Sequence, residues 1–485
     1  MTINGKARMK PTKSQDISTK KGENIQMASQ MSEIPLEKFE GLVVDLMRHS
    51  KVPGMSIGAV LDGRSVYTRG FGARNREKNL PMTPDTLWRI ASISKSFCAM
   101  AIMQLVEKGK VDLHAPVSKY IDFKLGKKDK PITVHHLLSH SSGVPELDAT
   151  TAATEKNMFI PMSSEKDFLT FVNKAGTEIF NDPGRIFLYN NDMYTCLGFI
   201  VEKLTGMKYA DYVKERILKP LGMSRSTFIQ EEFENDRDIT VGYIPSKDGQ
   251  SLDLSTLQDD PLEYACGGLY SSVRELQNYM IALMNGGIFN DNCLLEKSSI
   301  EEMWKPRIAT PERYAGDGYG YGWLISKDFF GHTLIGHAGG IPTSGGLLAM
   351  VPEKKAGVVL GQIPVPTGIH TGIVLGLLAI LIGQDFDKAV SMIETQKTLE
   401  HLQGKYKNYG GSEMEVSMQN GILHAKVTWV WGGSVTFPLA VKDLRKLKFS
   451  IPFAPPGKEG EVQGFIDKKT RKVSFQWDRY YFHTT

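Results

Sequence analysis

Segments with strand patterns lie at both ends of a long helical stretch, and this arrangement constrains the fold more than any other feature. The first two are joined through Asp62-Gly63, a strong hairpin signal. A single antiparallel sheet built from both ends, with the helical middle inserted as an all-α subdomain, satisfies the pattern. The expected strands are residues 55–60, 65–69, 321–326, 333–336, 346–351 and 357–361, and the expected helices are 35–50, 93–107, 134–138, 166–174, 193–205, 209–217, 272–285 and 372–383.

The last eighty or so residues have a different character. Segments 414–418 and 423–429 alternate around Asn420-Gly421, a second hairpin signal, and 473–477 alternates again. We therefore expect an α/β (α+β) sandwich with flanking helices, followed by a small all-β, barrel-like domain. The expected boundaries are a disordered tail over 1–33, the sandwich over 34–385, a helical linker over 386–400 and the β-domain over 401–485.

Composition excludes several classes of function. A net charge of +4 spread over 485 residues is no footprint for nucleic acid. The apolar run 372–383 is about a dozen residues, short of the roughly 20 that a membrane span needs, and residues 1–32 lack the apolar segment of a secretory signal. Four scattered cysteines without metal-type spacing favour a reducing compartment. We expect a cytoplasmic protein without a membrane partner.

The strongest local signal is Ser92-Ile93-Ser94-Lys95 at the start of an apolar helical run. Positions three apart share one helix face, so Ser92 and Lys95 should stand side by side. A serine hydroxyl is a weak nucleophile until a neighbour takes its proton. The pair is a candidate activated nucleophile, although a helix cap beside a solvated lysine would have the same sequence.

Two further motifs supply candidate partners. Tyr189-Asn190-Asn191 precedes an expected helix, and an ammonium near Tyr189 would stabilise its phenolate, which could then act as a general base. His337-Ala-Gly-Gly340 follows an expected strand, and its small residues let backbone N–H groups approach a ligand, as an oxyanion hole requires.

Together, S-x-x-K, Y-x-N and H-x-G resemble the serine β-lactamase and penicillin-binding-protein superfamily. Residues 132–143, 111–120, 267–272 and 319–323 also look like that family, and the resemblance covers about residues 36–385. It is closest to the class C-type branch, with its family VIII esterases and D-aminopeptidase-like peptidases. The C-terminal domain is similar, in pattern only, to the lipocalin-like β-domains appended to some of these hydrolases.

The resemblance implies a role for each motif residue. Ser92 would be acylated, Lys95 would keep Ser92 and Tyr189 in their reactive protonation states, and Tyr189 would shuttle the proton and activate water. Asn191 would bind the acyl side chain, and His337 and Gly339 would line the strand side of the cleft. The backbone N–H groups of Ser92 and Gly340 would form the oxyanion hole. The resemblance implies no metal and no cofactor.

One departure bears on the substrate. The third motif of the β-lactamases begins with lysine, whereas His337 is mostly neutral at pH 7 and a poorer anchor for a carboxylate. We therefore expect a serine hydrolase that cleaves esters, amides or peptides. A β-lactamase or D,D-carboxypeptidase, and a penicillin-binding sensor with little turnover, remain alternatives. The expected partners are a small-molecule or peptide substrate, with a homo-oligomer left open.

Two clusters are interpreted as structural. His135, His136 and His140 have no acidic partner at metal-ligand spacing, so a packing role at a helix end is favoured. Trp429, Trp431 and Trp477 are interpreted as β-domain core. No second acidic base is identifiable in the sequence.

Overall fold

A computed structural model describes residues 36–150, 162, 164–245, 252–255, 260–311, 316–363, 369–384, 395, 398–419, 422–444, 446–451, 460–467, 469–477 and 479–484. The chain forms two compact units, residues 1–51 and 52–485. The first unit contributes the helix α2 (Leu36–His49), which confirms the helix expected over 35–50. The whole predicted tail over 1–33, most of the predicted linker and the Asn420-Gly421 turn lie outside the described residues.

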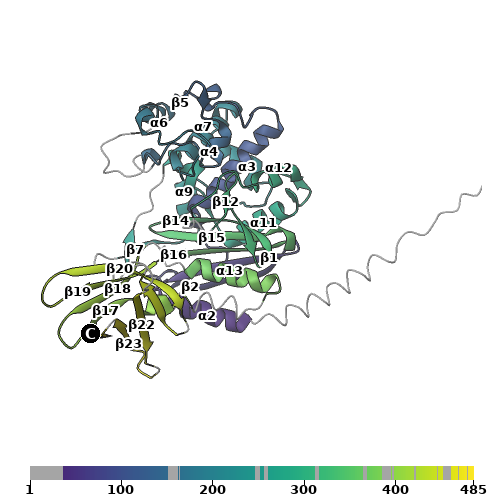
Figure 1. The fold of residues 1–485 in the computed structure, drawn as a ribbon. Coiled ribbons are helices and arrows are strands. Elements are labelled where there is room, and N and C mark those ends of the chain that lie inside the picture. Colours follow the sequence, from purple (N-terminus) through teal and green to yellow (C-terminus); the bar gives the residue numbers. More distant parts are fainter. Residues whose placement is uncertain are drawn as a thin grey trace, which may run out of the picture. The chain divides into compact units, whose positions relative to one another are not determined.

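The second unit is built on an antiparallel sheet with the strand order β12-β13-β14-β15-β16-β1-β2-β3. One neighbouring pair in its interior, β1 (Gly54–Leu61) and β16 (Ala356–Ile363), joins segments about 300 residues apart, with Gly54 opposite Ile363. Figure 1 shows β14, β15, β16 and β1 side by side. The sheet expected from the two ends of the chain is confirmed.

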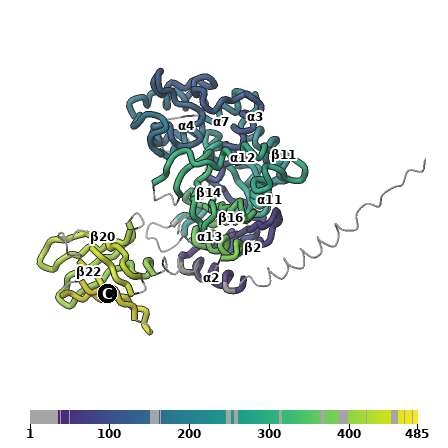
Figure 2. The backbone as a smooth tube through the Cα atoms, turned by 45° about the vertical axis from the view of Figure 1, so that its right-hand side comes forward, coloured from purple at the N-terminus to yellow at the C-terminus, as the bar shows by residue number. Residues whose placement is uncertain are grey.

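Helices cover both faces of this sheet. All eight residues of β16 are buried, although alternate side chains of a strand point to opposite faces. Helix α11 (Val273–Met284) packs Gln277 against Gly58, and α13 (Ile369–Leu381) packs on β15 and β16. The two helices lie on opposite sides of the strands in Figure 1, and α13 lies next to β16 again in Figure 2.

The helical middle of the chain forms the predicted subdomain. Helix α3 (Ser94–Glu107) is buried along almost its whole length, because it packs against α7 (Asn191–Thr205), α8 (Tyr209–Val213) and α10 (Tyr264–Gly267). This explains why its sequence is apolar all round rather than amphipathic. The expected helix 209–217 is wrong in part, since α8 ends at Val213 and a π-helical turn, Lys214–Leu218, follows.

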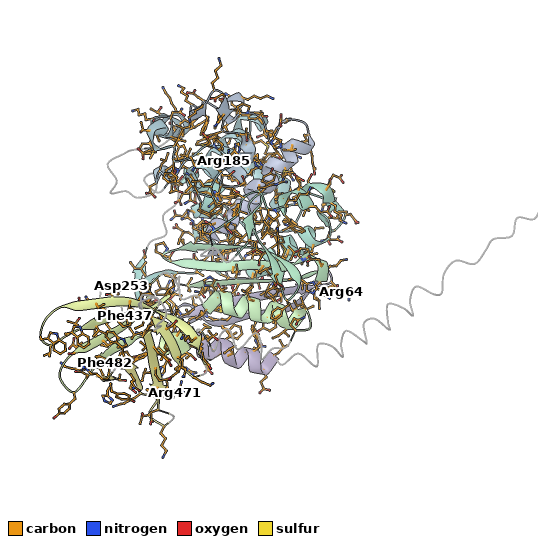
Figure 3. All side chains as sticks on the ribbon, viewed as in Figure 1. Arg64, Arg185, Asp253, Phe437, Arg471 and Phe482 are labelled. Carbon is orange, nitrogen blue, oxygen red and sulfur yellow. The ribbon has the colours of Figure 1, made fainter. Side chains whose placement is uncertain are left out.

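The C-terminal domain is a closed eight-stranded barrel in which each strand pairs with the next and β24 returns to β17. Alternating strands such as β19 (Ile422–Thr428) place every second side chain inside. These inward side chains form a continuous packed core that includes Phe437 and Phe482, both labelled in Figure 3. The lipocalin-like expectation is therefore confirmed at the level of barrel architecture.

The tryptophan prediction holds only in part. Trp429 and Trp477 pack against the barrel core, as expected. The prediction is wrong for Trp431, because its side chain is 68% exposed. Its ring stacks on that of Trp429, with 4.9 Å between the ring centroids.

Strand boundaries differ from the sequence expectation on one side of the sheet. The strand expected at 321–326 begins only at Leu324, because Gly322 has a φ of 77° and forms a turn before it. The strand expected at 333–336 is β14 (His332–Ile341), so the His337 motif lies inside a strand and not after one.

The remaining elements complete the two domains. The other helices are α4 (Val134–Leu138), α6 (Glu165–Val172), α9 (Gln230–Glu234) and α12 (Lys297–Met303). The other strands are β2 (Arg64–Asn75), β3 (Leu80–Pro81), β4 (Trp88–Arg89), β5 (Gly126–Lys127), β6 (Lys130–Pro131), β7 (Gly242–Pro245), β8 (Leu252–Ser255), β9 (Tyr270–Ser271), β10 (Ile288–Phe289), β11 (Asn292–Cys293), β12 (Gly318–Tyr319), β13 (Leu324–Phe329), β15 (Ser344–Val351), β17 (Gly404–Lys407), β18 (Glu413–Gln419), β20 (Ser434–Asp443), β21 (Lys448–Ile451), β22 (Gly460–Ile466), β23 (Val473–Trp477) and β24 (Tyr480–Thr484).

Trp88 anchors β4 to the sheet, and a substitution beneath it should destabilise the domain. A Cβ at Gly361 would meet the Trp88 ring at 2.2 Å, so Gly361→Ala forces the ring or the strand to move. We expect a loss of about 1–3 kcal/mol in the free energy of unfolding, measured by denaturant titration. Gly176→Ala, where a Cβ meets nothing within 4 Å, is the matched control. Equal stability of the two variants would contradict this packing.

Candidate active site

Ser92 lies in a short 3₁₀ turn, Ala91–Ile93, between β4 and α3. Ala91 has a φ of 48°, a left-handed conformation that is uncommon for a residue with a Cβ. Ser92 is half-buried, whereas Ala91 and the residues from 93 to 100 are buried. The turn thus presents the serine from an otherwise enclosed segment.

Lys95 is completely buried, and its ammonium group is fully hydrogen-bonded. Nζ donates to Ser92 Oγ at 3.1 Å, to Asn191 Oδ1 at 2.7 Å and to the Cys266 carbonyl at 2.8 Å. All three acceptors are neutral groups. The side-by-side placement of Ser92 and Lys95 expected from the sequence is therefore found in the structure.

The Tyr189 motif meets the same lysine. Lys95 Nζ lies 4.8 Å from the centre of the Tyr189 ring and 5.5 Å from that of Tyr194. Asn191 is the first residue of α7 and not a loop residue as expected, and Asn190 is its cap, accepting from the Met193 N–H at 2.9 Å. Because Asn190 supplies the helix cap, the Asn191 side chain is available to accept a hydrogen bond from Lys95.

His337 is a neutral imidazole with both ring nitrogens occupied. Nδ1 lies 2.6 Å from the Ala338 carbonyl, which only accepts, so Nδ1 donates and Nε2 accepts from the Tyr319 hydroxyl at 3.0 Å. Burial, then the nearby Lys95 charge, lowers the pKa of His337 to about 3. Its ring lies 6.3 Å from that of Tyr189.

The strand β14 brings its glycines against the serine turn. β14 pairs with β13 only as far as Gly336, so the edge of residues 337–341 is free of β13. A Cβ at Gly339 would lie 2.0 Å from the Ile90 carbonyl oxygen and 3.2 Å from the Ser92 nitrogen. Only glycine permits this approach. Gly340 follows as an exposed residue, and its oxyanion role stays a prediction.

Sequence reasoning missed Glu146, an acidic residue at the site. Its Oε2 accepts from the Asn191 N–H at 2.6 Å, and its Oε1 is buried without a hydrogen-bond partner among the described residues. Burial, and then the neighbouring Asp192 carboxylate, raises the pKa of Glu146. No spacing rule links residues 146 and 191, and the one available signal was an acid just after the 132–143 motif.

His140 was assigned to packing, and it packs within the site itself. Its ring lies 4.2 Å from that of Tyr189 and 4.7 Å from that of Tyr319. Nδ1 accepts from the Asn190 N–H at 3.1 Å, which leaves the proton on Nε2. Burial, then the charge of Lys95, holds the pKa of His140 well below its usual range. The imidazole therefore supports the tyrosines as a neutral group.

The described residues contain no group of His, Cys, Asp or Glu arranged to hold a metal ion. His135 Nδ1 instead lies 2.7 Å from the Tyr321 hydroxyl, and His136 completes the cap of α4 with Thr133. All four cysteines are free thiols. No helix in the described ranges is both long and apolar enough to cross a membrane.

Comparison with known proteins shows the family to which this fold belongs. The family model described as Beta-lactamase matches residues 39–361, two thirds of the chain. The protein therefore belongs to the β-lactamase family, within the superfamily of the penicillin-binding proteins.

Three proteins similar to this chain carry different names. Protein flp of Staphylococcus aureus is 27% identical over 334 residues, 67% of this chain and 62% of that protein, so the match spans about three fifths of the relative. The octameric penicillin-binding protein homologue from Pyrococcus abyssi is 35% identical, covering 93% of this chain and all of that one, with a TM-score of 0.81. A D-stereospecific amidohydrolase from Streptomyces is 27% identical over 64% of this chain and 89% of its own, with a TM-score of 0.52.

The buried histidines predict acid sensitivity. In the unfolded chain imidazoles gain a proton below about pH 6.5, whereas folded His337 stays neutral down to about 3 and His135 to about 4. Below about pH 6.5 the unfolded state therefore binds more protons than the folded state. The free energy of unfolding is highest above that pH and falls as the pH drops towards 4. We expect His337→Gln to lessen the fall in unfolding midpoint between pH 7.5 and 4.5. His483→Gln, at an exposed barrel residue, should leave the fall unchanged, and parallel curves for His337→Gln and wild type would contradict the assignment.

Proposed function

We propose that this protein is a serine hydrolase that cleaves amide or ester bonds through an acyl-enzyme on Ser92. The observation that carries the proposal is the shared hydrogen bonding of Lys95 Nζ, which links Ser92 Oγ to the Asn191 amide. A lone capping serine beside a surface lysine would not have a completely buried ammonium group. Membership of the β-lactamase family supports the same chemistry.

In the proposed reaction, Ser92 Oγ bonds to the substrate carbonyl carbon as its proton passes to Tyr189, whose phenolate the neighbouring Lys95 ammonium stabilises. The negative charge on the carbonyl oxygen is met by the N–H groups of Ser92 and Gly340. Tyr189 then protonates the leaving amine or alcohol as the scissile bond breaks. Water, deprotonated by Tyr189, hydrolyses the acyl-enzyme and restores Ser92. An oxyanion donor of this kind is worth roughly 3–4 kcal/mol of barrier.

The neutral His337 supports substrates without an obligatory carboxylate beside the scissile bond. A buried imidazole between Tyr319 and the Ala338 carbonyl has no charge to offer an anion near pH 7. We therefore favour short acyl esters and amino-acid amides, with D-amides prominent because a similar structure is a D-stereospecific amidohydrolase. A β-lactamase or D,D-carboxypeptidase, and an acylating sensor, are the competing functions.

A substrate panel tests the proposal. Wild-type protein should turn over p-nitrophenyl acetate or a D-alanine p-nitroanilide, and Ser92→Ala should lower kcat/KM about a thousandfold or more. Lys128→Ala, at an exposed residue of the turn between β5 and β6, is prepared in the same way as a control and should keep wild-type activity. Intact-mass spectra after penicillin should show no lasting adduct. Equal activity of Ser92→Ala would overturn the hydrolase assignment, and a stable penicillin adduct without ester turnover would favour the sensor.

The barrel gives the protein a candidate surface for self-assembly. One end of the barrel carries Tyr409, Val430 and Trp431, which we call the aromatic rim; they are 107%, 64% and 68% exposed. Exposed apolar side chains grouped in this way are typical of protein contact sites. Because the similar Pyrococcus protein is octameric and aligns over 93% of this chain, we propose that the rim contacts a second copy. The free thiols fit a reducing compartment such as the cytoplasm.

Light scattering tests whether the aromatic rim mediates self-assembly. We expect the wild type to be an oligomer and the double variant Val430→Ser, Trp431→Ser to have a smaller mass, since it loses apolar contact area. Ile422→Ser removes a side chain that is 50% exposed at the start of β19, away from the rim, and should leave the mass unchanged. A monomeric wild type, or an unchanged mass in the double variant, would contradict self-assembly through the rim.

A further inference from the structure

Two carboxyl groups lie side by side where α7 begins, and their surroundings differ sharply. Asp192 is completely buried and accepts three hydrogen bonds: from the Leu147 N–H at 3.0 Å, and from the Thr150 N–H and hydroxyl, both at 2.8 Å. Three donors match an ionised carboxylate, which only accepts. Asp192 is therefore the partner that holds the negative charge.

Glu146 has the opposite surroundings. It receives one hydrogen bond, from the Asn191 N–H, and its other oxygen is buried without a partner among the described residues. Two adjacent buried carboxyls do not both ionise readily, and the one with fewer donors keeps the proton. The raised pKa of Glu146, caused first by burial and then by Asp192, agrees with this division.

The charged and titratable groups facing Glu146 come from three elements. Asp192 lies on α7, Lys95 on α3, and the Cys266 thiol on α10. Burial raises the pKa of Cys266 to about 12, so this thiol stays neutral throughout the working range. Lys95 is thus the cation whose surroundings change when Glu146 gains or loses its proton.

We propose that Glu146 is a positioning residue that works in its neutral form, holding the first residue of α7 so that the Asn191 amide meets Lys95. This rests on the proposed function. Loss of the proton places a second anion next to Asp192 and within the field of Lys95. The new carboxylate then attracts the Lys95 ammonium, and Lys95 stabilises the Tyr189 phenolate less well when Tyr189 takes the proton of Ser92. Turnover should therefore decline on the alkaline side as Glu146 ionises.

The pH dependence of kcat/KM for a p-nitrophenyl ester tests this inference. In Glu146→Gln the amide oxygen can still accept from the Asn191 N–H but the group cannot ionise. We expect activity within about threefold of wild type at pH 6.5, with the alkaline decline moved upward by at least one pH unit. Glu146→Ala, which loses the acceptor, should be at least about tenfold less active at every pH. Glu165→Gln is the matched control for the pH profile, because burial also raises the pKa of that glutamate on α6; its profile should match that of the wild type.

A second measurement does not depend on catalysis. A carboxyl whose folded pKa is raised binds its proton more tightly in the folded state, so stability falls as the pH rises above about 4.5. The unfolding midpoint of Glu146→Gln, measured relative to that of the wild type, should therefore rise between pH 5 and pH 8.5. Superimposable pH–rate profiles, loss of activity in Glu146→Gln, or a constant midpoint difference would overturn the inference. Absence of Ser92-dependent turnover, with the midpoint gain still present, would overturn only the proposed function.

Discussion

The burial of the Lys95 ammonium group organises the rest of the structure. A lysine with no exposed surface is tolerated only when every donor is used. Its three acceptors come from the 3₁₀ turn, from the start of α7 and from α10. One cation therefore fixes the position of Ser92 relative to segments that lie about 100 and 170 residues further along the chain.

The sheet supplies the other half of the site. Strand β14 leaves β13 after Gly336 and runs past the serine turn, with Gly339 close to the Ser92 nitrogen. The same strand carries His337, whose hydrogen bonds to Tyr319 and Ala338 keep it neutral. The site thus combines one buried cation with neutral aromatic and imidazole rings, and for this reason uncharged acyl groups are favoured in the proposed function.

The site also keeps several ionisable groups out of their charged forms. His140 and His337 are neutral because burial and Lys95 oppose a second positive charge. Glu146 holds a proton beside the ionised Asp192 in the proposed arrangement. The common physical cause is burial in a low-dielectric interior, where each added charge needs a dedicated partner. This makes Lys95 the cation that the mechanism proposed here relies on.

The sequence by itself determined the antiparallel sheet built from both ends of the chain, the helical subdomain and the closing β-domain, because these follow from local hydrophobic periodicity. It also predicted the proximity of Ser92 and Lys95, since one helical turn separates them. Only the tertiary structure decided that Asn190 caps α7, that the His337 motif lies within β14, and that Glu146 meets Asn191. The alternating sequence pattern of the β-domain likewise did not indicate that Trp431 is exposed. These features depend on contacts between residues distant in the chain and on burial, and neither is encoded in the spacing of residue types.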